Sequence, residues 1–152
     1  MSEVKIQREL FNQVVDEIKP LLEKHWKEVA NYRDDIKLEP DWQRYEALEN
    51  NGALLILTAR RDDVLVGYSV FIISNHLHYT SCKVGANDIL FLLPEERKGR
   101  VGMKLIMESE KVLKQVGVNR VIWHVKKEPD FSPLLKHLGY EHEEIVMGKL
   151  LK

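Results

Sequence analysis

The spacing of apolar residues changes at Gly52, and this change constrains the fold more than any other feature of the sequence. Before Gly52, apolar side chains recur every three or four residues over 10–29 and 42–49, which predicts helices with one buried face. After it, 53–59 and 64–74 are almost continuous apolar runs, which are typical of buried strands. The sequence therefore predicts helices followed by a sheet.

Strand and helix patterns alternate in the second half of the chain. They predict a strand at 88–93, a helix over 105–116, a strand at 118–125, a short helix at 130–138 and a final strand at 140–151. A strand, a helix and a second strand in this order form a parallel crossover. The predicted class is therefore mixed α/β, with a twisted central sheet flanked by helices.

Three shorter signals complete this prediction. Residues 4–7 favour a short strand, and Arg61-Asp62-Asp63 favours a tight hairpin turn between the two apolar runs. Pro20 is expected to kink the first helix or to divide it in two. Because the sequence has no repeat and no linker rich in Gly, Ser or Pro, residues 1–152 are expected to form a single domain.

Composition limits the partners that the protein can have. With 31% charged and 44% hydrophobic residues, the sequence is typical of a soluble globular protein. A net charge of -1 argues against a general nucleic-acid-binding surface, and a local basic site at 97–100 is the only such alternative. Cys82, the single cysteine, cannot form an internal disulfide, and no apolar run is long enough to cross a membrane. We therefore expect a cytoplasmic protein with no membrane partner.

The segment 89–106 is the most informative for function, because a buried strand leads through a basic, glycine-containing loop into an amphipathic helix. Unpaired N–H groups at a helix N-terminus attract anions. Gly99 and Gly102 have no side chains and would let a phosphate approach the backbone. The alternative is an ordinary loop with solvated basic residues. Three cations surround the same point: Arg97, Lys98 and Arg100.

Residues 92–102 resemble the acetyl-CoA pyrophosphate motif of the GNAT superfamily of N-acetyltransferases, which reads Arg/Gln-x-x-Gly-x-Gly/Ala after a strand and a proline. Arg97 and Gly102 match the first and last positions, whereas Arg100 replaces the middle glycine. The order of helices and strands resembles this superfamily along the whole chain. The segment His76-Leu77-His78-Tyr79 makes a compact phage or prophage member the nearest resemblance.

The resemblance implies a site for acetyl-CoA as co-substrate. The strand 88–93 would part from the strand 118–125 and admit the pantetheine arm between them. A backbone N–H near Leu92 would then face the thioester carbonyl, and backbone amides from Lys98 to Met103 would hold the pyrophosphate. The implied contacts are Leu92, Leu93, Arg97, Lys98, Gly99, Arg100, Val101, Gly102 and Met103.

The implied activity is transfer of the acetyl group to a primary amine of a small molecule or protein, by direct attack in a ternary complex. Many members protonate the leaving thiolate from a tyrosine four residues before a Gly-aromatic pair. That pair matches Gly139-Tyr140 here, but the tyrosine position holds Leu135. A non-catalytic CoA-binding sensor or scaffold is therefore the alternative. The acceptor is not specified by the sequence, and base rates favour a homodimer.

Four side chains are candidate acids or bases. Asp88 could accept the amine proton directly or through water, and His124 lies on the strand that flanks the proposed gap. His76 and His78 share one face of an extended segment and are candidates for the substrate pocket. Ordinary structural roles are the alternative for each. The His76, His78 and Cys82 spacing lacks a fourth ligand, so no metal is expected. Three aromatic residues are candidates for the acceptor cleft: Trp42, Tyr45 and Tyr68.

Overall fold

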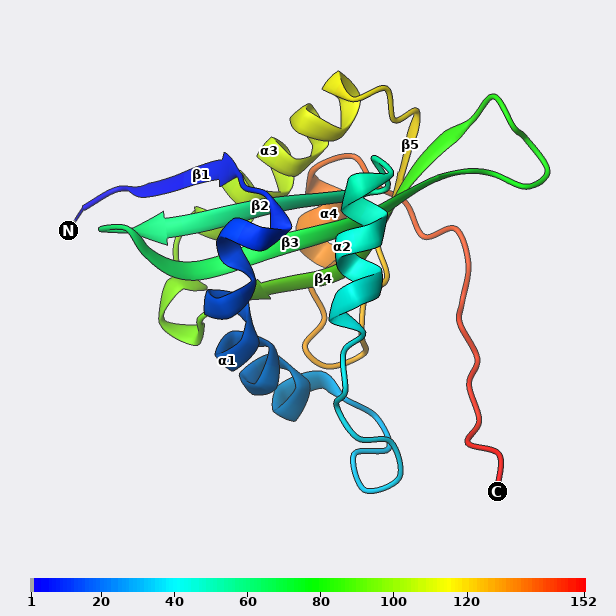
Figure 1. The fold of residues 1–152 in the computed structure, drawn as a ribbon, viewed down its shortest axis with the longest axis horizontal. Coiled ribbons are helices and arrows are strands. Elements are labelled where there is room, and N and C mark those ends of the chain that lie inside the picture. The colour runs from blue at the N-terminus through cyan, green and yellow to red at the C-terminus, as the bar shows by residue number, and fades with distance from the viewer. Residues whose placement is uncertain (1) are drawn as a thin grey trace.

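A five-stranded sheet with strand order β1-β2-β3-β4-β5 forms the centre of the computed structural model (Figure 1). Its strands are β1 (Val4–Arg8), β2 (Leu54–Arg61), β3 (Val64–Asn75), β4 (Lys83–Leu92) and β5 (Arg120–Ile122). The first four strands pair antiparallel, and β5 joins β4 in parallel. The structure describes residues 2–152, so Met1, where the expected domain begins, lies outside the described residues. The predicted mixed α/β class is confirmed.

Helices cover both faces of this sheet. In Figure 1, α1 and α2 lie in front of it, and α3 and α4 lie behind it. None of the helices within residues 2–152 has the length and apolarity needed to span a bilayer. The helices are α1 (Phe11–Val29), α2 (Trp42–Asn50), the short 3-10 helix η1 (Pro94–Glu96), α3 (Val101–Gln115) and α4 (Ser132–His137).

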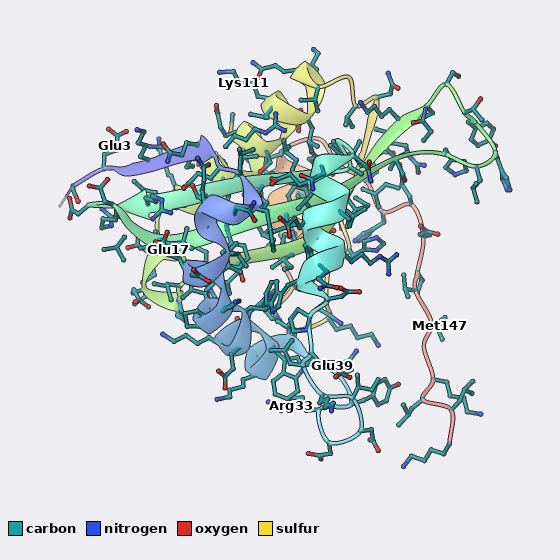
Figure 2. The ribbon with its side chains drawn as sticks, in the orientation of Figure 1. Glu3, Glu17, Arg33, Glu39, Lys111 and Met147 are labelled. Carbon is teal, nitrogen blue, oxygen red and sulfur yellow. The ribbon has the colours of Figure 1, made fainter. Side chains whose placement is uncertain are left out.

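The predicted final strand at 140–151 is wrong, because residues 140–152 form neither helix nor strand. Figure 2 shows Met147 on a segment that runs clear of the sheet and helices. The side chains of Ile145, Val146 and Met147 are 85%, 77% and 88% exposed. A strand needs a neighbour for its backbone hydrogen bonds, and no strand within residues 2–152 pairs with this segment.

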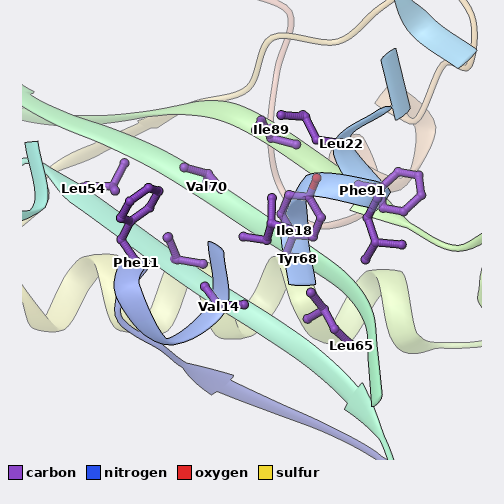
Figure 3. Close-up of a cluster of buried hydrophobic side chains, with 12 residues drawn as sticks. Phe11, Val14, Ile18, Leu22, Leu54, Leu65, Tyr68, Val70, Ile89 and Phe91 are labelled. Carbon is purple, nitrogen blue, oxygen red and sulfur yellow. The ribbon is translucent and has the colours of Figure 1, made fainter. Parts of the chain in front are cut away.

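Two apolar clusters hold the helices on the sheet. Figure 3 shows the first, in which Val14 and Ile18 of α1 pack against Val70 and Phe91 of the sheet. In the second, Leu105 and Leu113 of α3 pack against the opposite face. The central strands are therefore covered on both faces, which explains their continuous apolar sequences.

The helix and turn boundaries follow from local chemistry. The carboxylate of Asp41 caps α2 by accepting a hydrogen bond from the Arg44 N–H at 3.0 Å. Asp62 and Asp63 have φ angles of 51° and 66°, as a two-residue hairpin turn requires. The predicted turn between β2 and β3 is thus confirmed.

Two predicted boundaries are wrong, and Pro20 does not divide the first helix. α1 continues through Pro20, which lies on its exposed side while the opposite side is buried in the core. β4 begins at Lys83 rather than at 88, because β3 extends to Asn75 and pairs with it. β5 covers only Arg120–Ile122 instead of 118–125, since it leaves β4 after three residue pairs.

Arg60 joins the sheet to α1 through two carboxylates. Its guanidinium donates to Glu9 at 2.8 Å and to Glu17 at 2.7 Å, and the side chains of Arg60 and Glu9 are each only 12% exposed. Burial raises the pKa of Glu9, but hydrogen bonds from Arg60 and Thr58 outweigh it and hold this pKa below its usual value. The hydrogen bond from Arg60 likewise lowers the pKa of Glu17.

We expect Arg60→Met to lower the free energy of unfolding by about 2–4 kcal/mol at neutral pH, because Glu9 stays buried without its cation. A carboxylate whose pKa is lower in the folded than in the unfolded protein stabilises the fold above its unfolded pKa of about 4.5. This stabilisation is lost as the pH falls through the folded pKa. The difference in free energy of unfolding between the parent and Arg60→Met should therefore be smaller at acidic pH. Urea unfolding at neutral and acidic pH measures this difference.

The matched control is Lys27→Met, because Lys27 forms an exposed ion pair with Glu23 at 3.3 Å. Its effect should stay within about 0.5 kcal/mol. An Arg60→Met deficit of the same size at both pH values would contradict the assignment of the stabilisation to these carboxylates.

Candidate active site

β4 and β5 stay together for only three residue pairs, Val84–Ala86 with Arg120–Ile122. β4 continues to Leu92, and within residues 2–152 no strand pairs with its last part on the β5 side. The sheet therefore opens between the C-terminal half of β4 and the segment that follows β5. This opening lies where the resemblance described above implied that two strands part.

The side-chain amide of Asn87 closes the inner end of the opening. Its Oδ1 accepts a hydrogen bond from the His124 N–H, and its Nδ2 donates to the His124 carbonyl oxygen at 3.4 Å. An amide that donates and accepts in this way takes the place of a neighbouring peptide group. Asn87 thus provides hydrogen-bond partners for the N–H and the carbonyl oxygen of His124 where the strands part. Sequence reasoning missed Asn87, which lies just before the predicted strand at 88–93. The structure shows that its side chain is only 9% exposed.

The backbone of Leu92 faces the opening. The Leu93 N–H donates to the Val66 carbonyl on β3 at 2.8 Å. Because backbone groups alternate in direction along a strand, the N–H of Leu92 points away from β3. The Leu92 carbonyl points the same way and accepts a hydrogen bond from Arg97 Nε at 2.8 Å. A backbone N–H with this direction can stabilise negative charge on an oxygen in the opening.

The loop after β4 brings an open helix N-terminus to the same end of the strand. α3 begins at Val101, with Arg100 as an N-cap whose side chain makes no capping hydrogen bond. A Cβ atom on Gly99 would meet nothing within 4 Å, and one on Gly102 would meet only Leu92 Cδ2, at 3.9 Å. The first-turn N–H groups and the absence of side chains fit an anionic group.

Arg97 is held against α1 and β4. Its two terminal nitrogens donate to Glu28, both at 2.7 Å, and its guanidinium lies 5.8 Å from the centre of the Phe91 ring. The hydrogen bonds from Arg97 lower the pKa of Glu28. Arg97 therefore fastens the loop to the fold, whereas Lys98 and Arg100 form no ion pair within residues 2–152.

Asp88 stands in a β-bulge inside β4, not at the start of the strand as expected. The register with β3 passes from Asn87 directly to Ile89, which leaves Asp88 as an extra residue without a partner. Its carboxylate accepts a hydrogen bond from the hydroxyl of Tyr45 on α2. The bulge thus turns a carboxylate toward α2.

Two phenols surround this carboxylate. Burial raises the pKa of Tyr45, and the hydrogen bond to Asp88 and its negative charge raise it further. Burial also raises the pKa of Tyr68, with a smaller effect from Asp88. The buried Tyr68 hydroxyl has no hydrogen-bond partner in the described part of the chain. Both phenols therefore stay protonated at neutral pH, and the Tyr45 hydroxyl can donate its hydrogen bond to Asp88.

The structure separates the four candidate acids and bases. His124 follows β5 and contacts Asn87, the neighbour of Asp88. His76 and His78 lie in the loop between β3 and β4, which projects beyond the sheet in Figure 1. This loop precedes Lys83, and at about 3.3 Å per residue the length of β4 puts it roughly 30 Å from Leu92. The structure thus brings Asp88 and the backbone of His124 to the part of β4 that borders the opening, but not the other two histidines.

Residue 135, where many family members have a tyrosine that protonates the leaving thiolate, is a leucine here. Leu135 on α4 is buried, with 4% exposure. Burial raises the pKa of the following Tyr140 to about 12, and its hydroxyl donates to Glu110 on α3 at 2.8 Å. Within residues 2–152, no group of three His, Cys, Asp or Glu side chains is placed to hold a metal ion.

The site thus combines a mixed sheet that opens beside β4 with a helix N-terminus flanked by Gly99 and Gly102. The model of the acetyltransferase (GNAT) family matches residues 13–140, most of the chain, and the chain therefore belongs to this family. The expected superfamily is thus confirmed, and the protein is an acetyltransferase. A comparison with curated proteins finds no match.

Solved acetyltransferases show the same fold. A ribosomal-protein-alanine N-acetyltransferase from Brucella melitensis biovar Abortus 2308 is 19% identical over 99% of both chains, with a TM-score of 0.71. An aminoglycoside acetyltransferase from an uncultured soil metagenomic sample is 17% identical over 98% of this chain and 97% of that one, with a TM-score of 0.74. A predicted acetyltransferase from Clostridium acetobutylicum, determined with acetyl-CoA, is 9% identical over 97% and 96%, with a TM-score of 0.73. The GNAT-like fold is therefore confirmed.

Proposed function

We propose that the protein transfers the acetyl group of acetyl-CoA to a primary amine by direct attack in a ternary complex, in the cytoplasm. The observation that carries this proposal is the opening beside β4. It combines a backbone N–H of Leu92, an open helix N-terminus after Gly99, and a carboxylate, Asp88, on the same strand. Membership of the acetyltransferase family supports acetyl transfer in general.

The residues at the opening fit acetyl-CoA as a substrate. Backbone amides from Lys98 to Met103 would hold the pyrophosphate, because the space beside Gly99 and Gly102 lets phosphate oxygens reach the backbone. Lys98 and Arg100 would add positive charge. When bound, acetyl-CoA supplies the acetyl group as an activated thioester.

Asp88 is the proposed base. An alkyl ammonium group has a pKa of roughly 10 and must lose a proton before its nitrogen can attack. Asp88 accepts that proton, directly or through a water, while Tyr45 holds the carboxylate in place. The C–N bond then forms, and the C–S bond breaks with its electron pair on sulfur. The second proton that the nitrogen loses passes to water, from which the leaving thiolate can be protonated. The N–H of Leu92 stabilises the negative charge that develops on the carbonyl oxygen.

The leaving group needs no phenol in this scheme. A thiol has a pKa of roughly 8.5, so its thiolate is a tolerable leaving group near neutral pH. The buried Leu135 is the observation that favours a second function, a CoA-binding sensor or scaffold without catalysis. The proposed acceptor is an amine-bearing small molecule or protein, in line with the aminoglycoside and ribosomal-protein-alanine acetyltransferases of the same fold.

Binding and turnover distinguish these functions. Acetyl-CoA at a hundredfold excess over its dissociation constant should stabilise the protein by roughly 2.7 kcal/mol, measured as a thermal shift. A panel of amines, with detection of the released thiol, then tests transfer. A thermal shift without turnover on any amine supports the sensor or scaffold, and no shift at saturating acetyl-CoA contradicts both functions.

We expect Arg97→Ala to weaken acetyl-CoA binding more at low salt than at high salt, because added ions screen the attraction of a cation for the pyrophosphate. The same change also releases the loop from Glu28. Glu28→Gln separates the two effects, since it weakens the anchor and leaves the cation. Calorimetric titration at two salt concentrations measures both variants. A loss of affinity that is equal for both variants and independent of salt would assign Arg97 to anchoring alone.

A further inference from the structure

Arg60 and Arg61 are neighbours at the end of β2, but they bind different parts of the protein. Arg60 binds the two carboxylates beside and on α1 that are described above. Arg61 instead binds Glu96, which lies in the loop between β4 and α3. That loop leads directly to the helix N-terminus of the candidate site. One arginine therefore fastens α1 to the sheet, and the other fastens the loop of the site.

The guanidinium of Arg61 is fully occupied by this contact and one other. Its Nε and one terminal nitrogen donate to the two carboxylate oxygens of Glu96, at 3.0 Å and 2.8 Å. Its third nitrogen donates to the carbonyl oxygen of Ser2. The side chains of Arg61 and Glu96 are only 19% and 13% exposed. Two parallel hydrogen bonds fix both the position and the orientation of the carboxylate. Arg61 thus holds the loop and is not a free cation.

The loop is fixed before it reaches the site and again where α3 begins. Its first part contacts three elements: Leu93 binds Val66 of β3, Glu96 binds Arg61 of β2 and Arg97 binds Glu28 of α1. Only residues 98–100 separate this part from α3, which begins at Val101 and is held to the sheet by the buried Leu105. Three residues between two fixed ends have few conformations. The amides of the site are therefore arranged in the empty protein.

We propose that Arg61 is a positioning residue for acetyl-CoA, although it is not among the residues expected to contact it. This inference rests on the proposed pyrophosphate site at residues 98–103. By holding Glu96, Arg61 keeps these residues in the arrangement that the pyrophosphate requires. A loop that is already ordered loses less conformational entropy when its ligand binds. Arg61 therefore raises the affinity through Glu96 and not through its own charge.

Two substitutions of opposite charge effect test this distinction. Arg61→Gln removes a positive charge, whereas Glu96→Gln removes a negative one. If charge alone mattered, the first would weaken the binding of an anionic ligand and the second would strengthen it. If position matters, both should raise the dissociation constant of acetyl-CoA by about 5- to 30-fold, which corresponds to ordering one further residue on binding. Calorimetric titration measures both constants. Equal or tighter binding in Glu96→Gln overturns the proposal.

Hydrogen exchange of the unliganded protein tests the loop itself. Three amides are hydrogen-bonded within the loop and the first turn of α3: those of Glu96, Arg97 and Lys104. They should exchange faster in Arg61→Gln than in the parent, whereas the amides of β2 and β3 should keep parental rates. Exchange of the three amides at the parental rate overturns the proposal.

Kinetics and a neighbouring arginine separate positioning from a general loss of stability. With an amine that the protein acetylates, Arg61→Gln should raise KM for acetyl-CoA and keep the parental kcat, because the bound ligand orders the loop. Arg60→Met is the matched control, since it lowers the stability of the fold but leaves the contact between Arg61 and Glu96 in place. It should keep the parental dissociation constant. An equal loss of affinity in Arg60→Met, or a loss of kcat without a change in KM in Arg61→Gln, overturns the proposal.

The parent protein separates a failure of this inference from a failure of the proposed function. A parent that shows no thermal shift with acetyl-CoA contradicts the site, and this inference with it. A parent that binds acetyl-CoA while Arg61→Gln and Glu96→Gln bind it equally well overturns only the role of Arg61.

Discussion

Gly102→Val should reduce the affinity for acetyl-CoA by about 100-fold or more and leave the unliganded protein about as stable as the parent. A Cβ atom at this position would meet only Leu92 Cδ2, at the ordinary contact distance of 3.9 Å, so the fold accommodates a side chain there. A branched side chain would instead stand between the pyrophosphate and the first-turn amides of α3. Each charge-assisted hydrogen bond that is lost costs about 1.5–3 kcal/mol, so one or two account for the effect.

Calorimetric titration with acetyl-CoA and urea unfolding without it measure the two quantities separately. Gly102→Ala is the graded control, because its single methyl group should cost less affinity than the branched valine. Equal affinity in Gly102→Val and the parent would show that this loop does not hold the pyrophosphate. A loss of stability in the unliganded variant would show that the glycine serves the fold instead.

Asp88→Asn should lower kcat for acetyl transfer by about 10²- to 10³-fold at neutral pH, within the range for loss of a general base. The amide keeps the shape of the carboxylate and its contact with Tyr45, but it cannot accept a proton. Tyr45→Phe keeps the charge and removes only the hydrogen bond, so we expect a smaller loss.

The histidines provide the comparison for this experiment. His124→Ala tests the second candidate at the opening, whose backbone contacts Asn87. His76→Ala and His78→Ala should keep parental rates, because their loop lies at the far end of β4. If Asp88→Asn and all three alanine variants keep parental rates between about pH 6 and pH 9, no side-chain base is needed. The chemistry would then rest on the Leu92 N–H and on water.

The order of helices and strands was predictable, because the apolar spacing from 10–29 through 64–74 reports burial directly. The parallel crossover also followed from the sequence, whereas the position of the opening was implied by the resemblance to the GNAT superfamily. The bulge at Asp88 did not, since nothing in a run of strand residues shows which one will be skipped by the partner strand. The bridge from Asn87 to His124 was hidden for a similar reason: it joins residues 37 positions apart.

The histidines and the C-terminal segment show a second limit. His76 and His78 are close in sequence to Asp88, but the hairpin between β3 and β4 carries them away from it. The strand predicted at 140–151 was wrong, because within residues 2–152 no strand pairs with this segment. Spacing along the chain predicts what a segment can form, and its neighbours decide whether it does.

The bulge in β4 corresponds to the insertion of a single residue in the strand. Asn87 pairs with Phe71 of β3, and Ile89 pairs with the neighbouring residue, Val70. Asp88 is therefore one extra residue in β4, and the strand is in register with β3 on both sides of it. One codon therefore separates a plain strand from one that carries a carboxylate toward α2. Evolution could gain or lose this group without disturbing the core, because no buried side chain changes its face when the codon is inserted or deleted.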